Sequence, residues 1–114
     1  MTKKYILEEG KIIVNESFSA EMVLKQLGGN KFIAMTGAKE FVQHKNYIRF
    51  KLPSRFAKDG INFVKITLNS KDLYDMEFGK VRGLNYKVIK TESDVHGDML
   101  KRVFKAVTGL DTHL

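Results

Sequence analysis

Apolar and polar residues alternate along the middle of the chain, which is the pattern of strands with one buried and one solvated face. In the segment 47–52, Ile48, Phe50 and Leu52 point to one side and two cations point to the other. Pro53 follows directly and ends this strand, because proline cannot donate a ladder hydrogen bond. Comparable strand-like runs occupy 63–68, 74–78 and 85–90.

Two further segments have apolar residues at helical spacing. The first helix is predicted over 19–27, with Ser19 as its N-cap and Gly28 as the glycine that ends it. The second is predicted over 95–108, with Asp94 as its cap. Both helices need a surface to dock on, because helices of this length are marginal in isolation.

The 114 residues are enough for one domain with its own core. Near the start of the chain, 4–7 and 11–14 flank Gly10 and predict a small hairpin. We therefore expect a single domain over 1–114, with 1–17 as an N-terminal hairpin extension and 18–114 as the core.

The order of these elements predicts an α+β fold. We expect an antiparallel sheet of about four to six strands. The short helix 19–27 and the longer helix 95–108 should cover one face of this sheet, and the other face should contact water.

The glycine pair between the first helix and the sheet invites two interpretations. Gly28-Gly29-Asn30-Lys31 contains the residue types of a phosphate-binding loop, but such a loop places its glycines before a helix and follows its lysine with Ser or Thr. A helix C-cap and tight turn fits this segment better. The apolar run 32–35 that follows fits a buried strand or a second helical turn, and four residues do not decide between them.

Composition excludes several classes of site. The chain has no cysteine, so it has no disulfide, thiolate metal site or cysteine nucleophile. No run approaches the roughly 20 apolar residues that cross a bilayer. Glu8 and Glu9 interrupt the first apolar run, which is then too short for a signal peptide. We expect a cytoplasmic protein that has no membrane partner.

Residues suited to catalysis or metal binding are present without the spacing that those functions need. His44, His96 and His113 are far apart, and a metal site would depend on carboxylates brought together by the fold. Asp75 and Glu77 share a strand face, where solvated carboxylates are more typical than a divalent-cation site. No nucleophile–base pair is visible, so we predict no enzyme activity, no catalytic residue, no metal and no cofactor.

Positive charge is concentrated in the middle of the chain. The net charge is +7, and residues 31–93, with thirteen Lys or Arg against six Asp or Glu, carry all of it. Such a field favours polyanions or acidic protein surfaces and also promotes solubility.

The segment 27–39 (LGGNKFIAMTGAK) resembles the signature of a family of small, largely uncharacterised proteins of bacteriophages and mobile elements. The segments 61–68 (INFVKITL), 74–78 (YDMEF) and 108–114 (TGLDTHL) are similar to the same family. This resemblance covers 19–114 and implies a role inside an infected bacterium, without implying an activity.

The residues therefore favour two functions in such a host. A basic, solvated sheet face with interleaved aromatics would bind single-stranded DNA or RNA, although a lysine-rich face also serves solubility alone. Alternatively, the protein binds and inhibits or redirects a host protein such as a defence factor or polymerase, with the N-terminal hairpin adding a strand to the partner's sheet. Exposed strand edges are compatible with a homodimer. The predicted nucleic-acid-binding residues are Tyr47, Arg49, Lys51, Arg55, Lys58, Phe63, Lys65 and Lys87.

Overall fold

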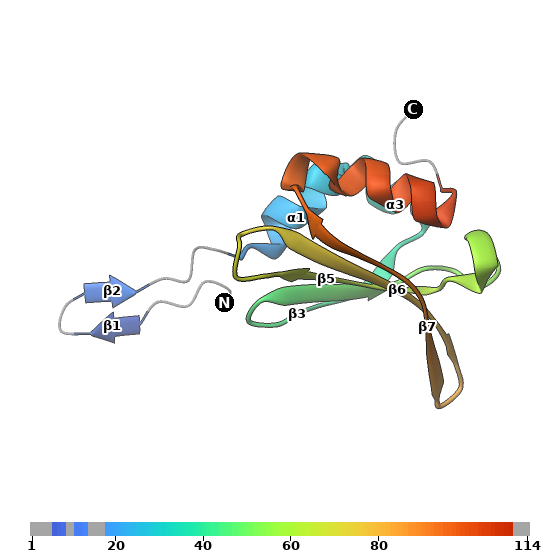
Figure 1. Cartoon of the computed structure of the whole chain (residues 1–114), viewed down its shortest axis with the longest axis horizontal. Coiled ribbons are helices and arrows are strands. Elements are labelled where there is room, and N and C mark those ends of the chain that lie inside the picture. The colour runs from blue at the N-terminus through green and yellow to red at the C-terminus, as the bar shows by residue number, and fades with distance from the viewer. Residues whose placement is uncertain (1–5, 9–10, 14–17, 111–114) are drawn as a thin grey trace.

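The computed structural model describes residues 6–8, 11–13 and 18–110. Five strands form one antiparallel sheet in sequence order, and the helices lie together on one of its faces (Figure 1). The strands of this sheet are β3 (Lys39–Gln43), β4 (Tyr47–Lys51), β5 (Phe63–Leu68), β6 (Tyr74–Arg82) and β7 (Asn85–Val95). The helices are α1 (Ala20–Leu27), α2 (Gly29–Thr36) and α3 (Leu100–Thr108), with short 3-10 turns η1 (Lys58–Gly60) and η2 (Gly97–Met99).

This arrangement confirms the predicted α+β fold, with an antiparallel sheet and a short helix near each end of the core. At the N-terminus, β1 (Ile6–Glu8) and β2 (Lys11–Ile13) pair with each other in a separate two-stranded sheet, as the hairpin prediction required. Gly10, the predicted turn residue, lies outside the described residues.

The structure corrects the local predictions at two places, the segment after the first helix and the start of the last helix. The undecided run 32–35 is helical and belongs to α2. Gly28 caps α1 as predicted, at φ 131°, but residues 29–31 are not a tight turn, because α2 begins at Gly29. Asp94 does not cap the last helix, which begins only at Leu100 after η2. Asp94 lies in β7 instead, where its backbone N–H donates to Asp75 Oδ1 (3.0 Å) and its carboxylate accepts from Lys71 (3.0 Å).

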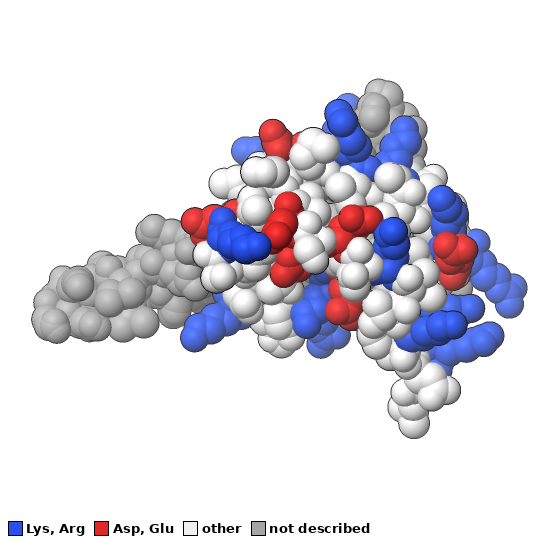
Figure 2. Space-filling view, viewed as in Figure 1, with Lys and Arg blue, Asp and Glu red and all other residues white. Residues whose placement is uncertain are grey.

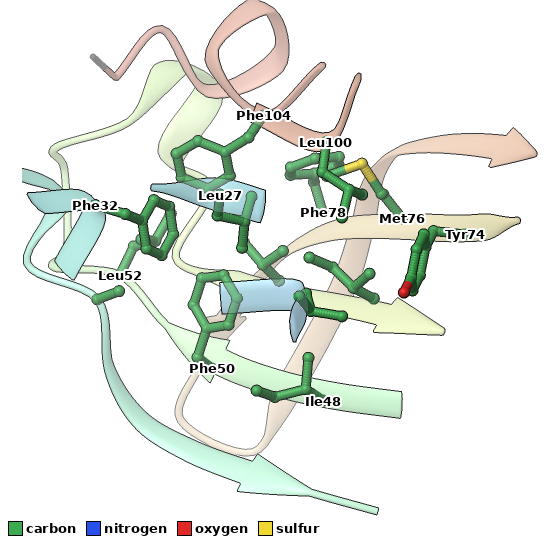
Figure 3. Packing of buried hydrophobic residues seen from close by; sticks show 14 of the residues in the cluster. Leu27, Phe32, Ile48, Phe50, Leu52, Tyr74, Met76, Phe78, Leu100 and Phe104 are labelled. Carbon is green, nitrogen blue, oxygen red and sulfur yellow. The ribbon is translucent and has the colours of Figure 1, made fainter. Parts of the chain in front are cut away.

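Aromatic rings join the helical layer to the sheet. The ring centroids of Phe32 on α2 and Phe104 on α3 are 5.0 Å apart, and Phe32 also meets Phe50 of β4 at 5.7 Å (Figure 3). Phe104 meets Phe78 of β6 at 6.4 Å. All four of these side chains are completely buried. Because edge-to-face rings add to the gain from burial, this cluster is the centre of the core.

The two helices that carry these rings end in the same way. Thr36 Oγ1 donates to the carbonyl of Phe32 (2.7 Å) and accepts from the N–H of Ala38 (3.2 Å). Thr108 repeats both bonds, to Phe104 (2.8 Å) and from Leu110 (3.1 Å). Each threonine is buried and precedes a left-handed glycine, so the hydroxyl satisfies backbone groups that the end of the helix would otherwise leave unpaired.

We expect Thr108→Val to lower the free energy of unfolding by about 1–3 kcal/mol, because valine keeps the shape but leaves the buried N–H of Leu110 without an acceptor. Thr108→Ser keeps the hydroxyl and should lose less stability than the valine variant. Urea denaturation followed by circular dichroism measures both. Equal losses for valine and serine would show that the methyl group, rather than the hydroxyl, stabilises this end.

Candidate nucleic-acid interface

The sheet face opposite the helices, here called the open face, carries most of the predicted binding residues. Strand register places them in rows, because residues paired across antiparallel strands project from the same side. The rows across β4, β5 and β6 are Tyr47–Thr67–Asp75, Arg49–Lys65–Glu77 and Lys51–Phe63–Gly79.

Tyr47 forms the first aromatic position on this face. The ring of His44 stacks on it at 4.3 Å between centroids, and the ammonium of Lys65 lies 4.4 Å from the centroid of the Tyr47 ring. The cation–π contact holds a positive charge beside a half-buried aromatic ring. A base that stacks on Tyr47 would have to replace one of these two contacts, and its phosphate could then bind the Lys65 ammonium.

Phe63 and Tyr86 form the second aromatic position, at the other end of β5. Their ring centroids lie 5.2 Å apart in an edge-to-face contact. Tyr86 extends across Gly79, where a Cβ would clash with the ring, and its hydroxyl donates to Glu77 (2.7 Å). Burial, followed by the hydrogen bond and the charge of Glu77, raises the pKa of Tyr86 well above its usual value. The phenol therefore remains a neutral donor.

Carboxylates offset much of the positive charge of the open face. Lys51 is paired with Glu40 (3.1 Å), and Glu77 lies directly opposite Lys65. The Asp75 carboxylate accepts from the side chain of Asn69 (3.1 Å). Cations therefore project from β4 and β5, whereas carboxylates project from β6. A depression of about 370 Å³ lies on the acidic side, lined by Lys65, Thr67, Asp75, Met76, Glu77, Thr91, Glu92 and Ser93.

Asp75 and Asp94, beside the β5–β6 turn, accept hydrogen bonds from the side chain of Asn69 and so have a structural role. Asn69 accepts from the backbone N–H groups of Lys71 and Leu73 and donates to Asp94 (2.9 Å). The hydrogen bond from Lys71 to Asp94 is the main reason that the pKa of Asp94 is below its usual value. Burial raises the pKa of Tyr74 next to this turn. Within the described ranges, no three His, Asp or Glu side chains gather closely enough to hold a metal ion.

Three of the predicted residues do not join the open face. Lys87 pairs with Lys80 and follows Tyr86, so its side chain projects from the opposite side of the strand. Lys58 lies in η1, beside the glycine that ends α3. Arg55 lies in the exposed loop before η1, with a positive φ of 61°. The open face therefore holds Tyr47, Arg49, Lys51, Phe63 and Lys65, and Tyr86 completes it.

Comparisons of this chain with protein-family models, curated proteins and solved structures find no match. The resemblance to a phage-encoded family therefore stays a prediction from the sequence. In the part of the chain that the structure describes, no helix is both long enough and apolar enough to cross a membrane.

We expect Gly79→Ala to destabilise the protein by about 1–3 kcal/mol, because the new methyl group would displace the ring of Tyr86 from Phe63 and Glu77. Tyr86→Ala removes the clash, so Gly79→Ala should cost much less in that background. A double-mutant cycle measured by urea denaturation gives this difference. Additive effects would contradict the contact between Tyr86 and Gly79.

Proposed function

We propose that this protein is a non-enzymatic nucleic-acid-binding protein that takes single-stranded DNA or RNA on its open face. We further propose, from the resemblance of the segment 27–39, that it acts in the cytoplasm of a phage-infected bacterium. The supporting observation is a row of cations between two aromatic positions, on the sheet face that the helices leave uncovered.

The spacing of these groups suits a single strand. Lys51 lies four positions after Tyr47 in β4, which is roughly 13 Å along an extended strand, and Phe63 is paired with Lys51. Arg49 and Lys65 are paired with each other between these two aromatic positions. Bases would stack on Tyr47 and on the Phe63–Tyr86 pair, and the phosphates between them would lie on the two cations.

The electrostatic part of this binding should be small. Arg49 and Lys65 have no carboxylate within 4.0 Å among the described residues, whereas Lys51 is already paired. Two phosphate contacts give a slope of about −1.4 for log K against log salt on single strands. Stacking should therefore provide much of the affinity, and binding should depend little on base sequence.

We expect fluorescence anisotropy with labelled oligo-dT and oligo-U to detect binding with this shallow salt slope. Tyr47→Leu and Phe63→Leu, which keep an apolar side chain but remove the aromatic ring, should each weaken binding by about 5- to 100-fold. Arg49→Gln with Lys65→Gln should bring the slope close to zero.

Phe56→Leu is the matched control, because Phe56 is an exposed aromatic residue in the loop after Pro53 and should leave affinity unchanged. Thermal melts establish that each variant is folded. The absence of binding at low salt, or equal losses for Phe56→Leu and Tyr47→Leu, would overturn the proposal. Capture of a host protein would then become the experiment of choice.

A further inference from the structure

The β6–β7 hairpin extends past the rest of the sheet. The pairing of β5 with β6 ends at Phe63 and Gly79, whereas β6 and β7 continue to pair up to Arg82 and Asn85. In Figure 1 this end of the hairpin projects below the sheet, away from the helices. We refer to residues 80–88 as the arm.

The base of the arm is fixed to the body by Asn62. Its side-chain NH₂ donates to the carbonyl of Val81 (3.0 Å), and its side-chain oxygen accepts from the N–H of Val81 (2.7 Å). This amide makes the pair of bonds that a neighbouring strand would make. The arm is therefore held in a defined direction although β5 has ended.

The tip of the arm presents one large apolar side chain. Arg82 pairs with Asn85 across a two-residue turn, in which Gly83 has φ 61° and Leu84 has no positive φ. That combination is the pattern of a type II′ hairpin turn, which needs glycine first and tolerates leucine second. Leu84 is fully exposed, and Tyr86 and Val88 below it are 43% and 47% exposed.

The arm is strongly basic on one side. Residues 78–91 contain four Lys or Arg and no Asp or Glu. Lys80, Arg82 and Lys87 have no carboxylate within 4.0 Å among the described residues, whereas Lys90 is paired with Glu92 (3.5 Å). Lys80 and Lys87 are paired and share the face opposite Tyr86. Figure 2 shows Lys and Arg gathered at this end of the molecule, above an uncharged tip.

We propose that the arm enters the minor groove of duplex DNA. Lys80, Arg82 and Lys87 contact phosphates at the groove edges, and Leu84 inserts between two base pairs and kinks the duplex. A leucine wedge with flanking cations is a chemistry that minor-groove proteins use to unstack a base step. A second copy of this chain is a poorer partner, because it would bring the same cations into contact. The arm shares Tyr86 with the open face, but the proposed duplex contacts use Leu84 and the three cations instead, so the proposal does not depend on single-strand binding.

The test uses the full chain and a duplex with 2-aminopurine at its central step, because unstacking raises the fluorescence of this base. Binding should give a fluorescence increase and a change in end-to-end energy transfer caused by the bend. Leu84→Ser should abolish both signals, with little change in the salt slope. Since Leu84 is fully exposed, this variant should be as stable as the parent.

The triple variant Lys80→Gln, Arg82→Gln, Lys87→Gln should reduce the magnitude of the duplex salt slope by about 2.7, as expected for three lost phosphate contacts. The variant Lys25→Gln, Lys31→Gln, Lys45→Gln is the matched control, because it removes the same charge from exposed positions elsewhere. Binding of oligo-dT should survive the arm variants, whereas duplex binding should survive Tyr47→Leu.

An unchanged 2-aminopurine signal in Leu84→Ser would overturn the proposal. Equal slopes for the two triple variants would also overturn it. Binding to anionic phosphatidylglycerol vesicles without duplex binding would overturn the proposal in favour of a membrane surface. A dimer in sedimentation equilibrium that Leu84→Ser dissociates would overturn it in favour of a second copy of the chain.

Discussion

The contact between Phe32 and Phe104 is the interaction on which the rest of the structure depends. One ring comes from the helix that precedes the sheet and the other from the helix that follows it, so their contact brings both ends of the core together over one face. Each ring also reaches a strand, through Phe50 or Phe78. The helical layer is therefore positioned by the aromatic cluster as well as by the covalent connections. The opposite face carries no helix in the part of the chain that the structure describes.

The matching ends of these two helices stabilise that arrangement. Phe32 and Phe104 each lie four residues before a buried threonine and a left-handed glycine, within the pattern F-x-A-x-T-G. The threonine bonds back to the carbonyl of the phenylalanine itself. The residue that fills the core is therefore also the residue at which the end of the helix is fixed.

Much of the fold could be predicted from the sequence, because alternation over 47–52 and 63–68 has a buried face wherever the helices cover the sheet. The helical nature of 32–35 could not be predicted from four apolar residues alone. The F-x-A-x-T-G pattern, shared with the C-terminal helix, was the available signal. The assignment of Asp94 as a cap overlooked that β7 continues to Val95, since a hydrogen-bond network with Asp75 and Lys71 keeps that residue in the strand.

Prediction of the candidate binding residues from the sequence has the same limit, because it depends on knowing which side of a strand is covered. Arg49, Lys51 and Lys65 lie on the predicted face, because covered strands separate inside from outside. Lys87 does not, because the arm extends beyond the helices and both of its faces contact water. Apolar residues in such a segment no longer mark the buried side, so Tyr86 faces the open side and the lysine faces away. The carboxylates that offset the basic face were visible in the sequence, but their partners depended on register.

Asn62 and Phe63 both contact the arm, and Phe63 also belongs to the open face. The side chain of Asn62 holds Val81 at the base of the arm, and the next side chain, Phe63, supports the ring of Tyr86 from the arm. Because Tyr86 belongs to the hairpin, the orientation of the hairpin also sets the position of the ring that covers Gly79. The arm and the open face are thus built on neighbouring residues of one strand and share the ring of Tyr86.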